Sequence, residues 1–282
     1  MLSLLPTPLG NLDDISLRCL QRLNDASVIL CEDTRVTKRL FYLLSQKPLV
    51  KQNFPRLDSV SKDFFSLHSH NQESFLSSLN PSFFSKPVVY CTDAGMPCIS
   101  DPGAMLIDYA RAHDIEYEVL LGGSAFQLAF AYSGLEGDFC FCGFLPQKQE
   151  ARRHRLGNLK AQHSSFHLIF YEAPSRLVKS LADIESLFPT ATIYLYKELT
   201  KLYMKEYRGL AGEILQALPD DIKGEYCLII ERGEASKQLC LSEEDLLAMP
   251  LSPRQKSKLL AKITSKSAKQ WYEILLRDSR SP

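Results

Sequence analysis

Short apolar runs alternate with amphipathic segments along most of the chain, and the runs have the length of buried β-strands. In the first half we predict strands at 2–5, 27–31, 64–67, 88–91 and 117–121, and helices at 15–23, 34–44, 72–79 and 102–113. Strands that alternate with helices form βαβ units. The first half of the chain therefore predicts a largely parallel sheet.

The same alternation resumes near residue 139, after a break that begins near residue 121. We predict strands at 139–143, 166–171, 192–196 and 226–231, and helices at 148–159, 175–187 and 212–218. The polar segment 47–62 predicts an irregular loop, and the chain closes with predicted helices at 242–248, 252–263 and 267–276. The fold class is thus α/β, with two α/β domains at 1–121 and 122–234 and a small helical domain at 235–282.

A candidate functional loop of about ten residues separates the strand 88–91 from the next helix. Asp93 and Gly95 favour a tight turn after the strand, because glycine accepts positive φ. Asp101 followed by Pro102 is typical of an N-cap and a first helical position. Loops of ten residues inside compact domains are usually functional, so we assign function to 93–97 and capping to 100–102.

Polar clusters follow the predicted strands of both halves. In the first half they lie at 7–11, 32–35, 68–71, 93–101 and 122–125, and in the second at 145–147, 171–172 and 198–201. The carboxyl ends of parallel strands share one edge of a sheet, where ligands bind in open α/β folds. The pattern predicts a ligand cleft between the two α/β domains.

Several common site signatures are absent from the sequence. It contains neither G-x-G-x-x-G nor G-x-x-x-x-G-K-[ST], and the stretch 122–124 lacks the second glycine of a nucleophile elbow. His68 and His70 have no evident third metal ligand, so we expect ordinary hydrogen bonds from them and no metal site. These observations argue against a phosphate-cradling loop and against a serine hydrolase.

The formal net charge is zero, so bulk charge gives no support for a nucleic-acid partner. Locally, basic residues crowd the segment 148–160 around a single Glu150, and residues 251–282 carry eight basic and two acidic side chains. Such patches suit phosphate contacts, although solvated helix faces have a similar composition. The eight cysteines form no C-x-x-C pair, and with no signal peptide or membrane span in the sequence we expect a cytoplasmic location.

Nine motifs occur in the order found in one known family: Thr7-Pro8-Leu9-Gly10-Asn11, Glu32-Asp33-Thr34-Arg35, His70-Asn71, Thr92-Asp93-Ala94-Gly95, Ser100-Asp101-Pro102-Gly103, Gly143-Phe144-Leu145-Pro146, Tyr171-Glu172, Glu198-Leu199-Thr200-Lys201 and Lys223-Gly224-Glu225. Over about residues 1–232 the chain resembles the ribosomal RNA small subunit methyltransferase I family, a branch of the tetrapyrrole methylases. Its helical end resembles that family's C-terminal domain. The E-D-T-R and E-L-T-K stretches make the narrower match specific.

The resemblance implies a homodimer, S-adenosylmethionine in the interdomain cleft, and methylation of the ribose 2′-hydroxyl of a decoding-region cytidine in 16S ribosomal RNA of the small subunit. It implies cofactor contacts from Leu9, Asp93, Ala94, Gly95, Met96, Ser124, Ala125 and Tyr171, largely through backbone groups. Alternatively, Tyr171 is a core residue at a strand end. The chain departs from the family at Leu121-Gly122-Gly123, where a proline-glycine-proline run is usual, and at Met96, where threonine is usual.

A ribose hydroxyl is a weak nucleophile, so a nearby base or polarising group should assist its methylation. We expect catalytic groups on both sides of the cleft: Glu32, Asp33 and Arg35 from the first domain, and Glu198 and Lys201 from the second. Asp33 and Arg35 have an equally simple local interpretation, as a helix cap and its ion-pair partner. RNA contacts are expected from Arg152, Arg153, Arg155, Lys256 and Lys258.

Two other functions fit parts of the sequence. A methylase of small tetrapyrroles would need no basic tail. An RNA-binding module without catalysis is suggested by the altered stretch 121–123. Methyl uptake by naked RNA, by small ribosomal subunits or by a porphyrinoid distinguishes these alternatives.

Overall fold

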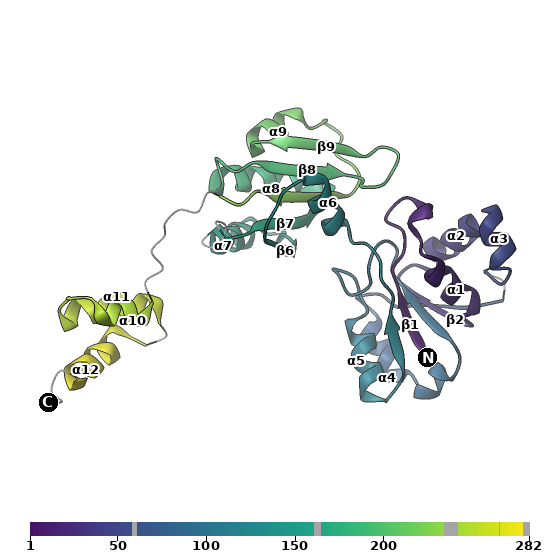
Figure 1. Cartoon of the computed structure of the whole chain (residues 1–282), viewed down its shortest axis with the longest axis horizontal. Helices are drawn as coiled ribbons and strands as arrows, with labels where there is room; N and C mark the ends of the chain where they lie inside the picture. The colour runs from purple at the N-terminus through teal and green to yellow at the C-terminus, as the bar shows by residue number, and fades with distance from the viewer. Residues whose placement is uncertain (58–60, 161–164, 234–241, 265, 279–282) are drawn as a thin grey trace. The chain divides into compact units, whose positions relative to one another are not determined.

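The computed structural model describes residues 1–57, 61–160, 165–233, 242–264 and 266–278 (Figure 1). The chain divides into two compact units, 1–234 and 235–282, which are described separately. The larger unit contains two five-stranded sheets, and the smaller unit is helical. The predicted α/β fold class is therefore confirmed, and in the described part of the chain each half has its own sheet.

The first sheet is parallel throughout and has the strand order β3-β2-β4-β1-β5. Its strands are β1 (Leu2–Leu5), β2 (Val28–Cys31), β3 (Asp63–Ser66), β4 (Val88–Cys91) and β5 (Tyr117–Val119). Every residue of β1, β2 and β4 is buried, as expected for central strands covered on both faces. The carboxyl ends of all five strands consequently lie at one edge of the sheet.

Helices cover both faces of this sheet. One core joins it to α1 (Leu17–Asp25), α2 (Thr34–Ser45) and α3 (Pro48–Asn53), and a second core joins its other face to α4 (Gln72–Ser78), the 3-10 turn Pro81–Ser85 and α5 (Ala104–Ala112). A further 3-10 turn, Leu12–Asp14, precedes α1. The α3 helix falls inside the segment expected to be an irregular loop, with Pro48 at its first position, where proline is well tolerated.

The second sheet is mixed, with the order β6-β7-β10-β8-β9. Its strands are β6 (Phe139–Phe144), β7 (His167–Glu172), β8 (Ile193–Lys197), β9 (Lys205–Gly209) and β10 (Tyr226–Ile230). The β10 strand is antiparallel to both β7 and β8, and β6 is parallel to β7. As a result the ends of β6, β7 and β8 meet the start of β10 at one edge.

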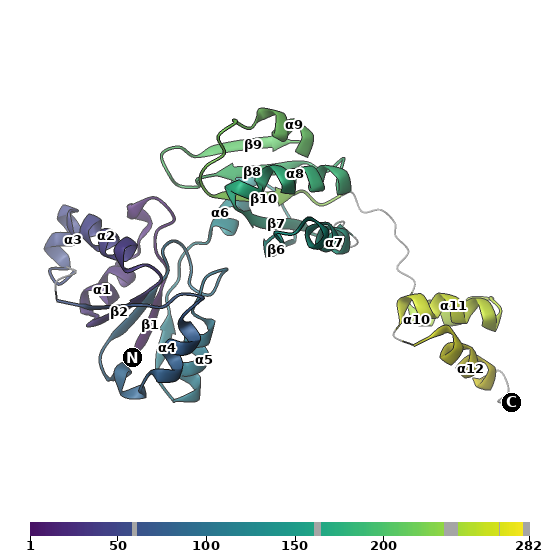
Figure 2. The same ribbon diagram turned by 180° about the vertical axis from the view of Figure 1, so that it is seen from behind.

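Helices α7 (Gln149–Lys160), α8 (Pro174–Leu187) and α9 (Ala211–Ala217) pack around one core of this sheet, and α6 (Ala125–Ser133) packs on the opposite face (Figures 1 and 2). The sequence patterns did not predict α6 or β9. The α6 segment is apolar on nearly all sides, which removes the amphipathic period. The edge strand β9 carries charged residues, which protect sheet edges but weaken the strand pattern.

The predicted start of α5 was wrong. The helix begins at Ala104 with Gly103 as its N-cap, so Asp101 and Pro102 belong to the preceding loop. Gly103 has φ +133°, and a Cβ there would approach Cys98 Sγ to 2.8 Å and the Tyr90 ring to 3.2 Å. Only glycine allows this loop to close over the ring.

The C-terminal unit consists of α10 (Glu243–Ala248), α11 (Pro253–Ile263) and α12 (Ala268–Asp278), close to the three helices expected from the sequence. Ser242 and Ser252 cap α10 and α11 through hydrogen bonds to backbone N–H groups. Leu246, Leu260 and Trp271 form a small buried core. Within the described segments, every helix is too short or too polar to cross a bilayer.

Candidate active site

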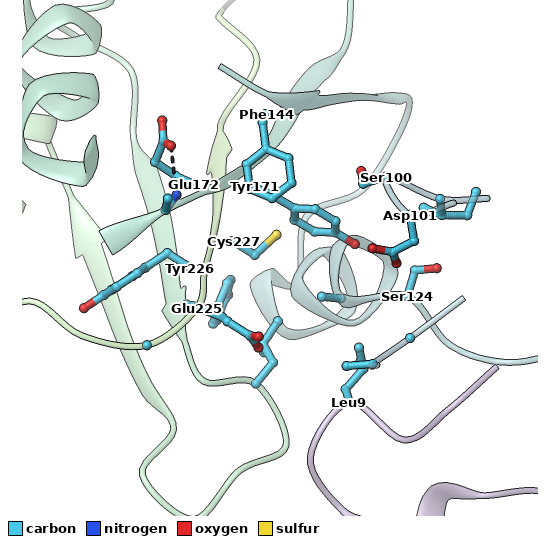
Figure 3. Close-up of a pocket in the computed structure, with 18 of the residues that line it drawn as sticks. Leu9, Ser100, Asp101, Ser124, Phe144, Tyr171, Glu172, Glu225, Tyr226 and Cys227 are labelled. Atoms are coloured by element: carbon cyan, nitrogen blue, oxygen red, sulfur yellow. Dashed lines mark hydrogen bonds between the residues drawn. The ribbon is translucent and has the colours of Figure 1, made fainter. Parts of the chain in front are cut away.

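A cavity of about 320 Å³ lies where the loops at the carboxyl edge of the first sheet meet the strand ends of the second (Figure 3). The first sheet contributes Leu9 after β1 and the segment 94–101 after β4. The second contributes Phe144, Tyr171 and residues 224–227. The volume and the mixture of apolar walls with a few polar groups are typical of small-molecule sites.

Hydrogen bonds fix the first wall of the cavity. Thr7 and Gly95 exchange two backbone hydrogen bonds, of 2.9 and 3.0 Å, which join the loop after β1 to the loop after β4. The Thr92 hydroxyl donates to the Gly95 carbonyl at 3.2 Å, and the Thr7 hydroxyl donates to the Thr92 carbonyl at 3.1 Å. The backbone between Ala94 and Met96 is therefore held in place as a rigid surface against which a ligand can lie.

Tyr171 organises the opposite wall. Its ring packs edge-on against Phe141 and Phe144, with centroid distances of 4.8 and 5.6 Å. Its hydroxyl accepts a hydrogen bond of 3.1 Å from the backbone N–H of Phe126, at the start of α6. Ser124 caps that helix in a capping box. The positive end of α6 thus lies at the cavity, where it favours a negatively charged ligand group.

Three carboxylates gather at the edge of the first sheet. Burial raises the pKa of Asp101 to about 6, assisted by the negative charges of Asp93 and Glu225. Burial likewise raises the pKa of Glu32 to about 7, assisted by Asp101 and Asp93. Asp93 also has a raised pKa because of burial, and it accepts a hydrogen bond of 3.2 Å from the Asp33 backbone N–H. Such shifts are frequent at functional sites.

Seven of the eight expected cofactor residues line the cavity: Leu9, Ala94, Gly95, Met96, Ser124, Ala125 and Tyr171. The eighth, Asp93, lies beside the cavity without lining it. Sequence reasoning missed Asp101, which lines the wall, because the Asp-Pro pair has the signature of a helix cap. The available signal was its position in a long loop after a buried strand.

The expected catalytic residues fall into two separate groups. In the first, Asp33 caps α2, and Arg35 pairs with it at 2.7 Å while its side chain is 90% exposed. Hydrogen bonds from Arg35 lower the pKa of Asp33 to about 2. In the second, Lys201 pairs with Glu198 at 3.2 Å and with Glu225 at 2.8 Å. Within the described segments, no hydrogen bond or ion pair joins the two groups.

The expected RNA-binding arginines of α7 differ in their exposure. Arg152 is only 2% exposed, and it pairs with buried Asp183 at 2.7 Å. A buried, paired guanidinium does not present itself to a phosphate, so the RNA contact expected of Arg152 is corrected to a structural role. Arg153 and Arg155 remain exposed, although Arg153 also contacts Asp183 and Arg155 donates to the Cys142 carbonyl. In α11, Lys256 donates to the Leu247 carbonyl, and Lys258 is exposed.

The raised pKa of Glu32 predicts a pH-dependent stability. A carboxyl whose pKa rises on folding binds more protons in the folded state, so the free energy of unfolding falls as pH rises from about 4.5 through about 7. We expect Glu32→Gln to raise the melting temperature at pH 8 and to change it less at pH 5. Thermal unfolding at both pH values tests this, with exposed Glu116→Gln as the control. Equal shifts at pH 5 and pH 8 for Glu32→Gln would contradict the buried-carboxylate interpretation.

The chain is similar in sequence to proteins that are already known. The family model described as Tetrapyrrole (Corrin/Porphyrin) Methylases matches residues 1–215. A Helicobacter pylori protein named Ribosomal RNA small subunit methyltransferase I is 42% identical over 278 residues, covering 96% of each chain. A protein of the same name from Campylobacter fetus is 39% identical, covering 98% of this chain and 100% of the relative.

Solved structures of low sequence identity share the fold. The methyltransferase CobJ superposes with a TM-score of 0.59 at 15% identity, covering 82% of this chain and 94% of that one. Uroporphyrin-III C-methyl transferase from Thermus thermophilus, solved in complex with S-adenosylhomocysteine, superposes with a TM-score of 0.54 at 14% identity, covering 81% of this chain and 96% of that one. At such identities the likeness concerns the fold alone.

Proposed function

The chain belongs to the ribosomal RNA small subunit methyltransferase I family of tetrapyrrole methylases, and from this premise we propose that it methylates the ribose 2′-hydroxyl of a decoding-region cytidine in small-subunit ribosomal RNA. Its methyl donor is S-adenosylmethionine. The observation that carries the proposal is the match of 42% identity across 96% of both chains. We also propose that it acts in the cytoplasm on an RNA-containing substrate.

The residues of the cavity fit this cofactor. S-adenosylmethionine has no phosphate, and the cavity is built without a phosphate loop. The start of α6, next to Ser124 and Ala125, suits the carboxylate of its amino-acid part, and the carboxylate of Glu225 suits its cationic or hydroxyl groups. The backbone between Ala94 and Met96 supplies further polar groups.

When bound, the cofactor supplies an electrophilic methyl group on a positively charged sulfur. The protein's task is to align an acceptor oxygen with that methyl group, which is mostly positioning. The rigid loops after β1 and β4 hold one side, and Tyr171 with Phe144 holds the other. Apolar walls exclude water from the space between them.

Ribose mapping tests the proposal directly. We expect a strain that lacks this protein to lose one 2′-O-methyl group in the decoding region, and the purified protein to restore it on isolated small subunits. Naked RNA and a porphyrinoid serve as alternative acceptors in the same assay. Methyl transfer to the porphyrinoid but not to RNA would replace the proposal with tetrapyrrole methylation, and binding without transfer would indicate a non-catalytic module.

The basic face of α11 gives a prediction about RNA affinity. Lys258 is exposed there, and each lost phosphate contact lowers the slope of log affinity against log salt by about 1. We therefore expect Lys258→Ala to weaken RNA binding and to reduce that slope by about 1, measured by fluorescence anisotropy. Lys86→Ala, at the opposite edge of the first sheet from the cavity, is the control. An unchanged slope for Lys258→Ala would show that this lysine is merely solvated.

We also propose that the chain forms a homodimer. Leu121 is 89% exposed and Tyr132 is largely exposed, and both line a second hollow of about 660 Å³ beside the linker to α6. Large exposed apolar side chains around a hollow are typical of protein interfaces. Sedimentation of the full chain distinguishes a dimer from a monomer.

A further inference from the structure

We infer that Asp101 is the group that accepts the proton of the acceptor hydroxyl during methyl transfer, with the buried Tyr90 hydroxyl and one buried carboxylate oxygen of Glu32 behind it. The inference deepens the proposed function and rests on it. Asp101 lines the cavity, and Figure 3 shows its carboxylate pointing into the cavity toward the Tyr171 hydroxyl. Glu32, one of the catalytic residues expected from the sequence, does not line the cavity.

The loop that carries Asp101 is constrained. Cys98 and Ser100 both have φ +67°, in the left-handed region that non-glycine residues rarely adopt. The Cys98 backbone N–H donates to the Pro102 carbonyl at 3.2 Å, which closes the loop on itself. Gly103 then allows the loop to lie directly on the Tyr90 ring. Strained loops of this kind are common where a side chain must be held in a set orientation.

Two polar atoms behind Asp101 lack hydrogen-bond partners within the described segments. Tyr90 is 0% exposed, and its hydroxyl has no partner. The buried Oε1 atom of Glu32 also has none. Both groups lie close enough to Asp101 for its charge to act on them. Buried polar groups are normally satisfied, so two unsatisfied groups beside one carboxylate indicate a site built to exchange a proton or bind a ligand.

The charges around Asp101 favour a base. The groups that face it are Asp93 and Glu32 from the first sheet edge, Cys98 in the same loop and Tyr90 beneath it, and Tyr171 and Glu225 from the second sheet. Within the described residues no ion pair involves Asp101, and the nearby cation Lys201 pairs with Glu198 and Glu225. Burial and these neighbours raise the pKa of Asp101 to about 6, so near neutral pH it is ionised yet more basic than an ordinary carboxylate.

The hydroxyl oxygen of the ribose forms a bond to the methyl carbon as the carbon–sulfur bond breaks, and the electron pair of that bond stays on sulfur, which becomes neutral. The hydroxyl proton moves to the Asp101 carboxylate, which becomes a neutral carboxylic acid. That proton then leaves to solvent, because Asp101 is only partly buried.

Asp101→Asn tests the inference, in the full-length protein with small ribosomal subunits as acceptor. We expect single-turnover methyl transfer at saturating cofactor to fall about 10²–10⁴-fold, the range of a lost general base, and the loss of activity at acidic pH to disappear from the pH–rate profile. Calorimetric affinity for S-adenosylhomocysteine should change by less than about threefold. Exposed Asp108→Asn on α5 is the matched control and should leave all three measurements unchanged.

A measurement without substrate accompanies the kinetics. Carbon-13 NMR of labelled aspartate in the free protein should show a carboxyl that titrates near pH 6 and is missing from Asp101→Asn. Asp101→Glu, which keeps a carboxylate, should retain part of the transfer activity and should still lose activity at acidic pH. If Asp101→Asn loses only cofactor affinity and transfers normally at saturation, Asp101 is a cofactor-binding residue and the inference is wrong.

Two further outcomes separate the inference from the proposed function. If Glu32→Gln removes the loss of activity at acidic pH from the pH–rate profile and Asp101→Asn does not, Glu32 is the base. The inference then fails while the proposed function stands. If the wild-type protein methylates an atom of the nucleobase instead of a ribose oxygen, both the proposed function and the inference fail. Digestion of the labelled RNA to nucleosides distinguishes these products.

Discussion

Asp183→Ala is expected to destabilise the larger unit by about 3–5 kcal/mol, because it leaves the buried guanidinium of Arg152 without a counter-ion. Arg152 donates to Asp183 from Nε at 2.8 Å and pairs from Nη2 at 2.7 Å. Arg153 and Gln149 also donate to the same carboxylate. Burial alone would raise the pKa of Asp183, but these hydrogen bonds hold it below its usual value. For a unit of this size, we expect the melting temperature to fall by roughly 6–20 °C.

A double variant provides the control for this prediction. Arg152→Met combined with Asp183→Leu removes both charges and should recover most of the lost stability, since a buried ion pair adds little over apolar residues of similar volume. Urea unfolding of the wild type, both single variants and the double variant gives the coupling energy. A loss below about 1 kcal/mol for Asp183→Ala would mean that water reaches Arg152 and that its burial is incomplete.

Gly122→Ala is expected to displace one wall of the cavity and so to slow methyl transfer. A methyl group at position 122 would overlap the Cβ and Cγ atoms of Pro6, whose ring cannot rotate away. Pro6 precedes Thr7, which holds the loop after β4 through its two hydrogen bonds to Gly95. Either the linker or this wall of the cavity must shift. Because a displacement of about 1 Å can cost 10²-fold in turnover, we expect methyl transfer to fall by about that factor.

The neighbouring glycine supplies a matched control. A methyl group at Gly123 would meet no atom within 4 Å. Gly123→Ala should therefore leave S-adenosylhomocysteine affinity and methyl transfer close to wild type, as measured by calorimetry and a tritium-transfer assay. If both alanines behave alike, the contact between Gly122 and Pro6 does not control the cavity.

The fold was largely predictable because its elements are specified locally. Fully apolar runs such as 2–5 and 88–91 fit only buried strands, and their alternation with amphipathic helices indicates a parallel sheet. The elements that escaped prediction carry weak local patterns. The helix α6 is apolar on nearly all sides, and the edge strand β9 is largely polar. Their structure depends on packing against the second sheet and on pairing with β8.

The sequence predicted where the site lies but not which of its side chains interact. Motifs after successive strands located the cavity, because strand polarity brings those loops to one edge. The same motifs did not show that Arg152 is buried against Asp183, thirty-one residues away. Nor did they show that α5 starts only at Ala104, so that Asp101 does not cap it. Such roles depend on contacts between distant segments.

The sequence by itself determined the α/β class, the shared edge where ligand loops gather, and the family to which the chain belongs, since these follow from local periodicity and from motif order. Only the tertiary structure decided which charges are buried, which carboxylate lines the cavity, and which ions are already paired. The physical reason is that burial and electrostatic coupling depend on distances in space, and these distances are set by how the sheets, helices and loops pack.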